Sequence, residues 1–280
     1  MTSAAPAPTV RLLHGAEMPV LGAGTSPLDD TDTERVVADA IAAGYRLIDT
    51  AENYRNEAGV GAGIRASGID RAELFVTSKF NKQWHGRELV AQALDRSLER
   101  LGLDYLDLLL IHWPNPGHGR YVEAWAGLAD LLESGRLKAI GTSNFKPAHL
   151  ERIIAETGVT PDVNQIQLSP AVTRAEARAF HAEHGIVTES WSPLGGLGIK
   201  VLDDPTIAGI AAQIGKTPAQ TILRWHIQLG LIAIPKSANA ERLRQNIDVF
   251  DVELSPEQMA AISALDQGEG AAFDSDRVGH

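Results

Sequence analysis

The stretch Tyr105-Leu-Asp-Leu-Leu-Leu-Ile111, followed at once by His112, indicates the fold more clearly than any other part of the chain. Its consecutive apolar residues predict a strand that is buried on both faces, as in a parallel sheet covered by helices. Amphipathic segments flank it, and we expect helices over Gly86–Leu101 and Val122–Leu132. A buried strand between two helices is the repeating unit of an α/β fold.

The same alternation recurs along most of the chain. Further strands are expected at Val20–Gly22, Arg46–Thr50, Leu74–Ser78, Leu137–Gly141, Val163–Ile166, Ile186–Glu189 and Leu231–Ile234. Further helices are expected at Asp32–Ala43, at Glu57–Ser67, and at about residues 147–156, 173–183, 205–214, 217–228 and 239–247. Eight strand–helix units in 280 residues predict a (β/α)8 TIM barrel. We expect an N-terminal β-hairpin (Val10–Leu13 with Met18–Leu21) before the barrel and extra helices near the C-terminus.

An open, doubly wound sheet is the main alternative, and it usually carries a glycine-rich turn after its first strand. Here that turn reads Gly22-Ala-Gly24-Thr-Ser-Pro27 and lacks the third glycine. A second cluster, Gly59-Val-Gly61-Ala-Gly63, lies inside an expected helix and indicates close helix packing. No Pro/Ser-rich linker divides the chain, so we predict one domain over residues 1–280, with residues 1–8 disordered.

Composition and charge exclude several classes of function. The chain has 36 acidic and 25 basic side chains, a net charge of −11, whereas nucleic-acid binding requires a basic face. It has no cysteine, which excludes disulfides, thiolate metal sites and cysteine nucleophiles. No metal site is expected, because no HExxH spacing occurs. There is no apolar run long enough to span a membrane and no signal-peptide pattern, so we expect a cytoplasmic protein.

Chemistry in a barrel of this kind lies at the C-terminal ends of the strands. Asp49, Lys79 and His112 end three successive strands, and Tyr54 lies five residues beyond Asp49. Taken singly, Asp49 is explained as a helix cap, Lys79 as a rim lysine and His112 as a packed histidine. Together they predict a site, since a lysine held by an aspartate lowers the pKa of a neighbouring tyrosine and makes it a tuned acid. A neutral His112 then orients a carbonyl oxygen that Tyr54 protonates.

The strand ends of the second half suit a long anionic cofactor. The residues there are Asn144, Gln165, Trp191 and Lys236, and Trp191 leads into the glycine-rich loop Ser192-Pro-Leu-Gly195-Gly196-Leu-Gly198. Backbone amides of such a loop approach a pyrophosphate, and an indole plane stacks on a ring. Lys236, Ser237 and Arg242 at a helix start form an anion site suited to a terminal phosphate, with a solvated basic helix start as the alternative. A Schiff-base lyase using Lys79 also fits the barrel, but it leaves this second half unexplained.

Five segments in this order resemble the aldo-keto reductase superfamily. They are Gly44-Tyr-Arg-Leu-Ile-Asp49-Thr-Ala-Glu-Asn-Tyr54, Leu109-Leu-Ile-His112-Trp-Pro, Ile140-Gly-Thr-Ser143-Asn144-Phe, Asn164-Gln165 and Ile234-Pro-Lys236-Ser237. The resemblance runs from about Val10 to Leu265 and implies reversible carbonyl reduction with NADPH/NADP+ on a small-molecule carbonyl substrate. It implies no Rossmann fold, in agreement with the missing glycine pattern.

Carried over residue by residue, the resemblance implies that Tyr54 is the proton donor and that Asp49, Lys79 and His112 complete the catalytic set. The same resemblance implies a role in cofactor binding for a larger group, which comprises Ser143, Asn144, Gln165, Trp191, Ser192, Leu194, Gly196, Lys236, Ser237, Arg242, Gln245 and Asn246. Within it, the resemblance implies that Ser143, Asn144 and Gln165 hold the nicotinamide carboxamide and that Gln245 and Asn246 contact adenine.

Some positions depart from the pattern of the family. Leu168-Ser169-Pro170 stands where relatives usually have an acidic or aromatic residue followed by His or Asn before the proline. Phe80-Asn81 stands where many relatives place a tryptophan in the substrate pocket, so we expect Trp84 and Trp113 to line that pocket instead. Short loops make the chain similar to the compact bacterial members, including 2,5-diketo-gluconate reductases, and predict an open pocket for aldehydes and small ketones. We expect a monomer. The alternative from another class is an NADPH-binding sensor or interaction subunit with little turnover, as in channel-associated relatives.

Overall fold

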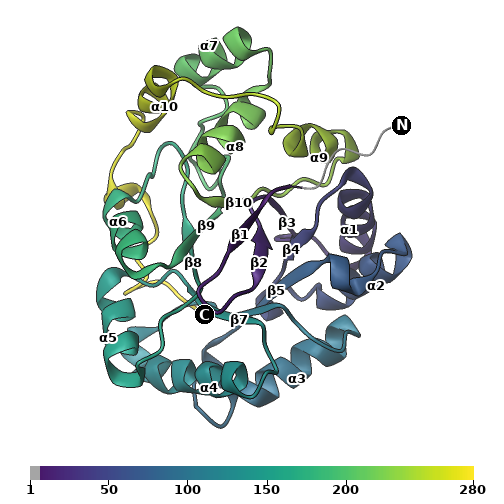
Figure 1. The fold of residues 1–280 in the computed structure, drawn as a ribbon, viewed down its shortest axis with the longest axis vertical. Coiled ribbons are helices and arrows are strands. Elements are labelled where there is room, and N and C mark those ends of the chain that lie inside the picture. Colours follow the sequence, from purple (N-terminus) through teal and green to yellow (C-terminus); the bar gives the residue numbers. More distant parts are fainter. Residues whose placement is uncertain (1–6) are drawn as a thin grey trace.

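Every apolar segment expected to be a strand forms one, and the strands pair in parallel in their order along the chain (Figure 1). The structure is a computed structural model, and it describes residues 7–280. The eight strands of the sheet are β3 (Gly22–Gly24), β4 (Leu47–Asp49), β5 (Phe75–Phe80), β6 (Leu108–Ile111), β7 (Ala139–Ser143), β8 (Val163–Gln167), β9 (Val187–Trp191) and β10 (Ile232–Ile234).

The first and last strands meet and close the sheet into a barrel. Leu21 and Ala233 form a parallel bridge, and the Ala233 amide donates to the Val20 carbonyl at 3.1 Å. The Gly24 amide donates to the Pro235 carbonyl, also at 3.1 Å. An open sheet has no contact between its outer strands, so the (β/α)8 barrel is confirmed and the doubly wound alternative is wrong.

Helices surround the barrel and cover its outer face (Figure 1). The α-helices are α1 (Asp30–Ala43), α2 (Glu57–Ser67), α3 (Val90–Leu101), α4 (Tyr121–Glu133), α5 (Pro147–Thr157), α6 (Ala175–His184), α7 (Pro205–Ile214), α8 (Pro218–Gln228), α9 (Ala240–Ile247) and α10 (Pro256–Ser263). Short 3-10 helices are η1 (Glu52–Tyr54), η2 (Arg71–Glu73), η3 (Lys82–Trp84), η4 (Pro116–His118) and η5 (Glu269–Ala271).

Most predicted boundaries lie within two residues of those observed, and two differ by more. The helix expected from Gly86 begins at Val90, because residues 86–89 form a turn in which the Leu89 amide donates to the Gly86 carbonyl. The strand expected from Tyr105 begins at Leu108. The reason is that the Asp107 carboxylate accepts the Val76 amide at 2.9 Å, and this side-chain bond takes the donor that would continue the ladder.

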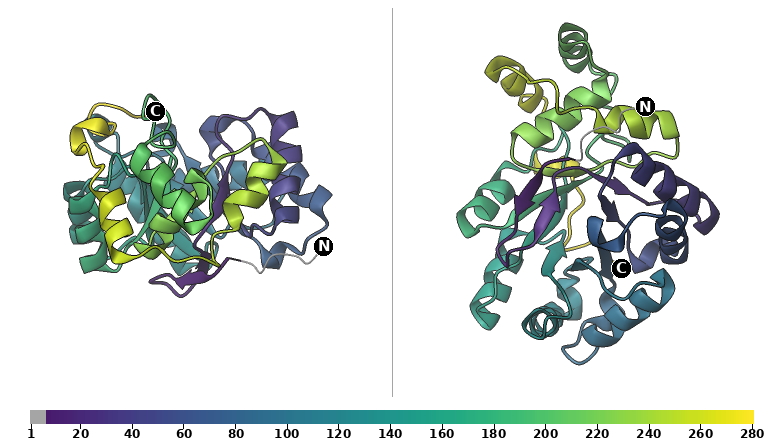
Figure 2. Two further views of the ribbon diagram at one scale, coloured as in Figure 1. Left: turned by 90° about the horizontal axis from the view of Figure 1, so that it is seen from above. Right: turned by 45° about the vertical axis from the view of Figure 1, so that its right-hand side comes forward.

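A short antiparallel hairpin closes the N-terminal end of the barrel. It consists of β1 (Thr9–Arg11) and β2 (Glu17–Pro19), and Figure 2 shows it opposite the end of the barrel that carries residue 280. Residues 1–6 of the segment predicted to be disordered lie outside the described residues. The prediction does not hold for the other two, since Ala7 is buried and the Pro8 carbonyl accepts the Val20 amide at 2.9 Å.

The extra helices near the C-terminus are α7 and α10, which lie outside α8 (Figure 1). Thr217 caps α8 through the Gln220 amide, as expected for a Thr-Pro start. Ile207 of α7, Trp225 of α8 and Ile262 of α10 belong to one buried apolar cluster. These helices therefore enlarge the hydrophobic core beside β8–β10. Among residues 7–280, no helix combines the length and the apolar character that crossing a membrane requires.

The glycine cluster of α2 lies where helices approach most closely. A Cβ added at Gly59 would meet the Asp30 carbonyl oxygen of α1 at 2.3 Å, and one at Gly61 would meet the Leu101 carbonyl oxygen of α3 at 1.7 Å. The predicted role in helix packing is confirmed. α2 begins directly after the β4–α2 loop, which carries Tyr54.

Replacing Gly61 tests this packing. We expect Gly61→Ala to lower the free energy of unfolding by about 1–3 kcal/mol, because α2 must move away from α3 to admit the methyl group. Gly209→Ala in α7 is the matched control, since a Cβ there has no neighbour within 4 Å. Urea unfolding measures both variants. Equal midpoints for Gly61→Ala and the wild type would contradict the packing role.

Candidate active site

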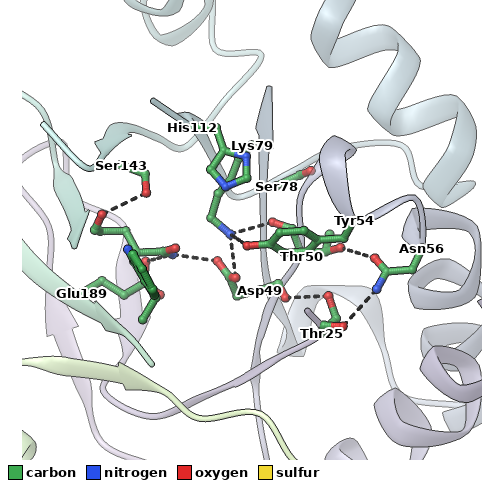
Figure 3. Close-up of polar contacts among 12 residues, drawn as sticks. Thr25, Asp49, Thr50, Tyr54, Asn56, Ser78, Lys79, His112, Ser143 and Glu189 are labelled. Carbon is green, nitrogen blue, oxygen red and sulfur yellow. Dashed lines mark hydrogen bonds and ion pairs between the residues drawn. The ribbon is translucent and has the colours of Figure 1, made fainter. Parts of the chain in front are cut away.

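Ionisable side chains from neighbouring strands converge at the C-terminal end of the barrel (Figure 3). Lys79 of β5 donates to Oδ1 of Asp49, the last residue of β4, at 2.7 Å and to the Thr50 carbonyl at 2.9 Å. Its Nζ lies 3.4 Å from the Tyr54 hydroxyl. Asp49 and Lys79 are almost completely buried, and His112 follows β6 beside them. The expected convergence of these four residues is therefore present.

The loop that carries Tyr54 is fixed by one buried amide. Asn56 donates through Nδ2 to the carbonyls of Thr25 and Leu28, each at 3.0 Å. Its Oδ1 accepts the Thr50 hydroxyl at 3.0 Å, so the side chain joins both ends of the loop (Figure 3). Because Asn56 has no exposed surface, these bonds are shielded from water and hold the phenol beside the lysine.

Tyr54 differs electrostatically from the expectation. Burial raises its pKa above the usual value of 10, Lys79 lowers it, and Asp49 and Glu189 raise it further. The net direction is upward, so the expected net lowering is wrong, because exclusion of water outweighs the lysine. The Tyr54 hydroxyl therefore keeps its proton at neutral pH.

Lys79 is charged at neutral pH, whereas His112 is neutral. Burial alone would lower the pKa of Lys79, but Asp49 and Tyr54 outweigh this effect and raise it, so Lys79 remains a cation. Burial, together with Lys79 and His280, lowers the pKa of His112 well below 6.5. The His112 imidazole is neutral at pH 7 and can share a hydrogen bond with a carbonyl oxygen. Its ring lies edge-on to the Tyr54 ring, with centroids 5.7 Å apart.

The second half of the barrel adds amide groups and an indole. Asn144 donates through Nδ2 to the His112 carbonyl at 3.1 Å and to the Ser143 hydroxyl at 3.0 Å. Its Oδ1 accepts the indole N–H of Trp191 at 2.8 Å. These bonds connect the loops after β6, β7 and β9 and place Ser143, Asn144 and Trp191 at the same mouth as Tyr54.

Gln165 connects the two halves of the barrel, because it bonds to Asp49 of β4 and to Glu189 of β9. Glu189 was not among the residues predicted from the sequence. The Gln165 Nε2 donates to Asp49 Oδ2 at 2.8 Å and to Glu189 Oε2 at 2.7 Å. Glu189 lies in β9 and is completely buried. The sequence signal for Glu189 is its place at the end of the strand predicted as Ile186–Glu189, two residues before Trp191.

A cavity of about 490 Å³ opens at this mouth. The predicted site residues that line it are Asp49, Tyr54, His112, Trp113, Ser143, Asn144, Gln165, Trp191, Ser192, Leu194 and Lys236. His280 also lines it, with its Nε2 3.3 Å from His112 Nδ1. No sequence signal pointed to His280, because the contact depends on how residues 273–280 return to the barrel mouth.

Trp84 does not line this cavity, so its predicted place in the substrate pocket is wrong. Its indole N–H donates to both carboxylate oxygens of Glu52, at 3.0 and 3.1 Å, which turns the ring toward η1. Phe80 and Leu168, two positions that depart from the family pattern, do not line the cavity either. Their side chains are buried in apolar clusters. Trp113 is the predicted pocket tryptophan that does line it.

The predicted anion site lies at the edge of the cavity, because Lys236 belongs to the lining and Arg242 does not. Lys236 and Arg242 are exposed, and neither forms an ion pair within residues 7–280. Asn239 caps α9, and its side chain accepts the amides of residues 241 and 242. The start of the helix therefore does not offer these amides to an anion, which differs from the prediction. Attraction of an anion to this site would therefore depend on the side chains of Lys236 and Arg242. Four further predicted residues lie outside the cavity lining. Gly196 is on the loop after β9, Ser237 is between β10 and α9, and Gln245 and Asn246 are on α9.

The loop after β9 folds closely on itself at Gly195. Gly195 has φ +80°, and a Cβ there would meet the Ile199 carbonyl oxygen at 2.7 Å. Only glycine fits that position. Ser192 and Leu194 precede it and line the cavity. Among residues 7–280 no group of three or more His, Cys, Asp or Glu side chains is arranged to hold a metal ion.

Comparison with known proteins shows what the chain is similar to. The model of the Aldo/keto reductase family matches residues 19–267. An aldo-keto reductase of Mycolicibacterium vanbaalenii is 51% identical over 268 residues, which cover 96% of this chain and 95% of the relative. One of Mycolicibacterium smegmatis is 48% identical over 262 residues, which cover 94% of each chain.

Solved structures agree in fold and sequence. An aldo/keto reductase from Brucella melitensis is 48% identical, with a TM-score of 0.89 and coverage of 93% of this chain and 100% of that chain. A mutant of Gox0644 in complex with NADPH is 43% identical, with a TM-score of 0.90 and 96% coverage of both chains. Sequence, fold and site geometry thus agree, and the chain belongs to the aldo/keto reductase family.

Proposed function

We propose that this protein reduces aldehydes and ketones to alcohols with NADPH, and that Tyr54 supplies the proton. The observation that carries this proposal is the Tyr54 hydroxyl 3.4 Å from Nζ of the buried Lys79, at a cavity that His112 also lines. Family membership and the NADPH complex of a relative with 43% identity support the cofactor.

The donor set at the mouth fits a nicotinamide. Gln165 uses its amide nitrogen on two carboxyl groups, so its amide oxygen is left to accept from a carboxamide N–H. Ser143 and Asn144 lie on the next strand and its loop, and the Trp191 indole offers an apolar plane. Bound there, NADPH would supply a hydride. The exposed Lys236 and Arg242 would hold its phosphate groups.

Tyr54 and Lys79 handle the proton. When the phenol gives its proton to a carbonyl oxygen, it becomes a phenolate 3.4 Å from Lys79 Nζ. The fixed cation stabilises that negative charge without reorganisation of water, and Asp49 keeps the lysine in place. His112, held neutral, orients the carbonyl oxygen toward the phenol.

A Schiff-base lyase requires a neutral, accessible lysine. Lys79 is a buried cation paired with Asp49, and it does not line the cavity. Both features favour the reductase.

Tyr54→Phe tests the proton donor. We expect kcat for carbonyl reduction to fall about 100-fold or more, because general acid catalysis contributes this much and only the hydroxyl is removed. The Kd for NADPH should stay within about twofold of the wild type. The measurement is loss of NADPH absorbance with a panel of aldehydes, ketones and dicarbonyls. Turnover that persists in Tyr54→Phe would exclude this role.

Arg242→Gln tests the phosphate site. We expect the KM for NADPH to rise roughly 10- to 100-fold, with little change for NADH, because a charge-assisted contact to the 2′-phosphate is lost. Arg244→Gln is the matched control, since Arg244 is exposed on the same helix. Equal effects on NADPH and NADH would contradict the assignment.

A further inference from the structure

Glu189 is a buried carboxyl group that the reaction described above does not use. It extends from β9 into the barrel (Figure 3), where it contacts Gln165, and none of its surface is exposed. Oε2 accepts the Gln165 amide at 2.7 Å, whereas Oε1 has no hydrogen-bond partner in the described residues. A completely buried group with an unpaired oxygen is costly, so a functional reason for it is expected.

The charges around Glu189 do not balance an ionised carboxylate. The titratable groups that face it are Asp49 from β4, Lys79 from β5 and Tyr54 from η1, while β8 presents the neutral Gln165 and β10 the apolar Ile232. Lys79 is the cation of this group, and it is already bound to Asp49. An ionised Glu189 would therefore be a buried charge without a partner, which costs far more than a protonated one.

Glu189 also determines which way Gln165 faces. The Gln165 Nε2 has two hydrogens, and Asp49 and Glu189 each accept one of them. This arrangement leaves the amide oxygen of Gln165 for the cavity, which the side chain lines. Without Glu189, one N–H would lose its acceptor, and the amide could rotate to present nitrogen where a carboxamide N–H must be accepted.

We propose that Glu189 is a positioning residue, held protonated below Gln165, which fixes the Gln165 amide with its oxygen toward the nicotinamide. This proposal rests on the proposed function, because it assigns Gln165 to the cofactor. It also adds a charge constraint, since ionisation of Glu189 places a second negative group beside Tyr54 and makes that phenol a weaker acid.

The pH dependence follows from the direction of the pKa shift. Burial raises the pKa of Glu189 from 4.5 to about 8, and Asp49 adds to the rise. In the unfolded chain the group ionises near its ordinary pKa, so the native state loses stability relative to the unfolded state as pH rises toward about 8. The reduction rate should also fall as the pH passes through about 8.

Two variants separate positioning from packing. Glu189→Gln keeps the shape and an oxygen that accepts from Gln165, but it does not ionise. Glu189→Leu removes the acceptor. We expect Glu189→Leu to weaken NADPH binding roughly 10-fold, the order expected for an orphaned buried donor, and Glu189→Gln to stay near the wild type. Quenching of tryptophan fluorescence by NADPH measures the Kd.

The Glu189→Gln variant also tests the protonation state. Its kcat/KM profile should lack the fall near pH 8, and its urea midpoint without cofactor should exceed that of the wild type increasingly from pH 5 to pH 8.5. Glu57→Gln is the matched control, because Glu57 is equally buried but is paired with Arg100 at 2.6 Å. The control should lose stability and keep the wild-type pH profile of activity.

Each outcome is decisive. Wild-type affinity in Glu189→Leu, or an unchanged pH profile in Glu189→Gln, would overturn the role of Glu189. If Glu189→Leu does not fold, the pH profile and urea midpoints of Glu189→Gln still decide the question. Absence of NADPH binding by the wild type would instead overturn the proposed function.

Discussion

Lys79 has no exposed side-chain surface, and the chemistry at the barrel mouth depends on keeping it charged there. Moving an ammonium group out of water costs several kcal/mol, so the cation persists only because Asp49 and the Thr50 carbonyl accept its hydrogens. The pairing of β4 with β5 fixes the two charged residues relative to each other. Rigid parallel strands are therefore what allow a buried cation to lie 3.4 Å from the Tyr54 hydroxyl.

The fold could be predicted because its signals are local. Apolar runs identify buried strands, and glycines end helices, as Gly44 does at φ 108° after α1. Three positions of the candidate site could be predicted from the fold alone, since the carboxyl ends of parallel strands share one edge of the barrel. Asp49, Lys79 and His112 end neighbouring strands, and the structure brings them together with Tyr54.

Other features depend on contacts between distant segments, which spacing along a sequence does not reveal. The pKa of Tyr54 is raised and not lowered, because the effect of burial exceeds that of Lys79, and spacing does not reveal how the two compare. Trp84 turns away from the cavity because Glu52, 32 residues earlier, accepts its N–H. Glu189 becomes part of the candidate site only through Gln165, on the neighbouring strand.

The central claim is that Lys79 lowers the pKa of Tyr54 and so opposes burial, which raises it. The most direct measurement is ¹³C NMR of tyrosine labelled at Cζ, titrated in the wild type and in Lys79→Met, with the Tyr54 signal assigned from Tyr54→Phe. We expect the Tyr54 pKa to be higher in Lys79→Met, because the lysine lowers it in the native site. A Tyr54 pKa that is equal or lower in Lys79→Met would contradict the claim.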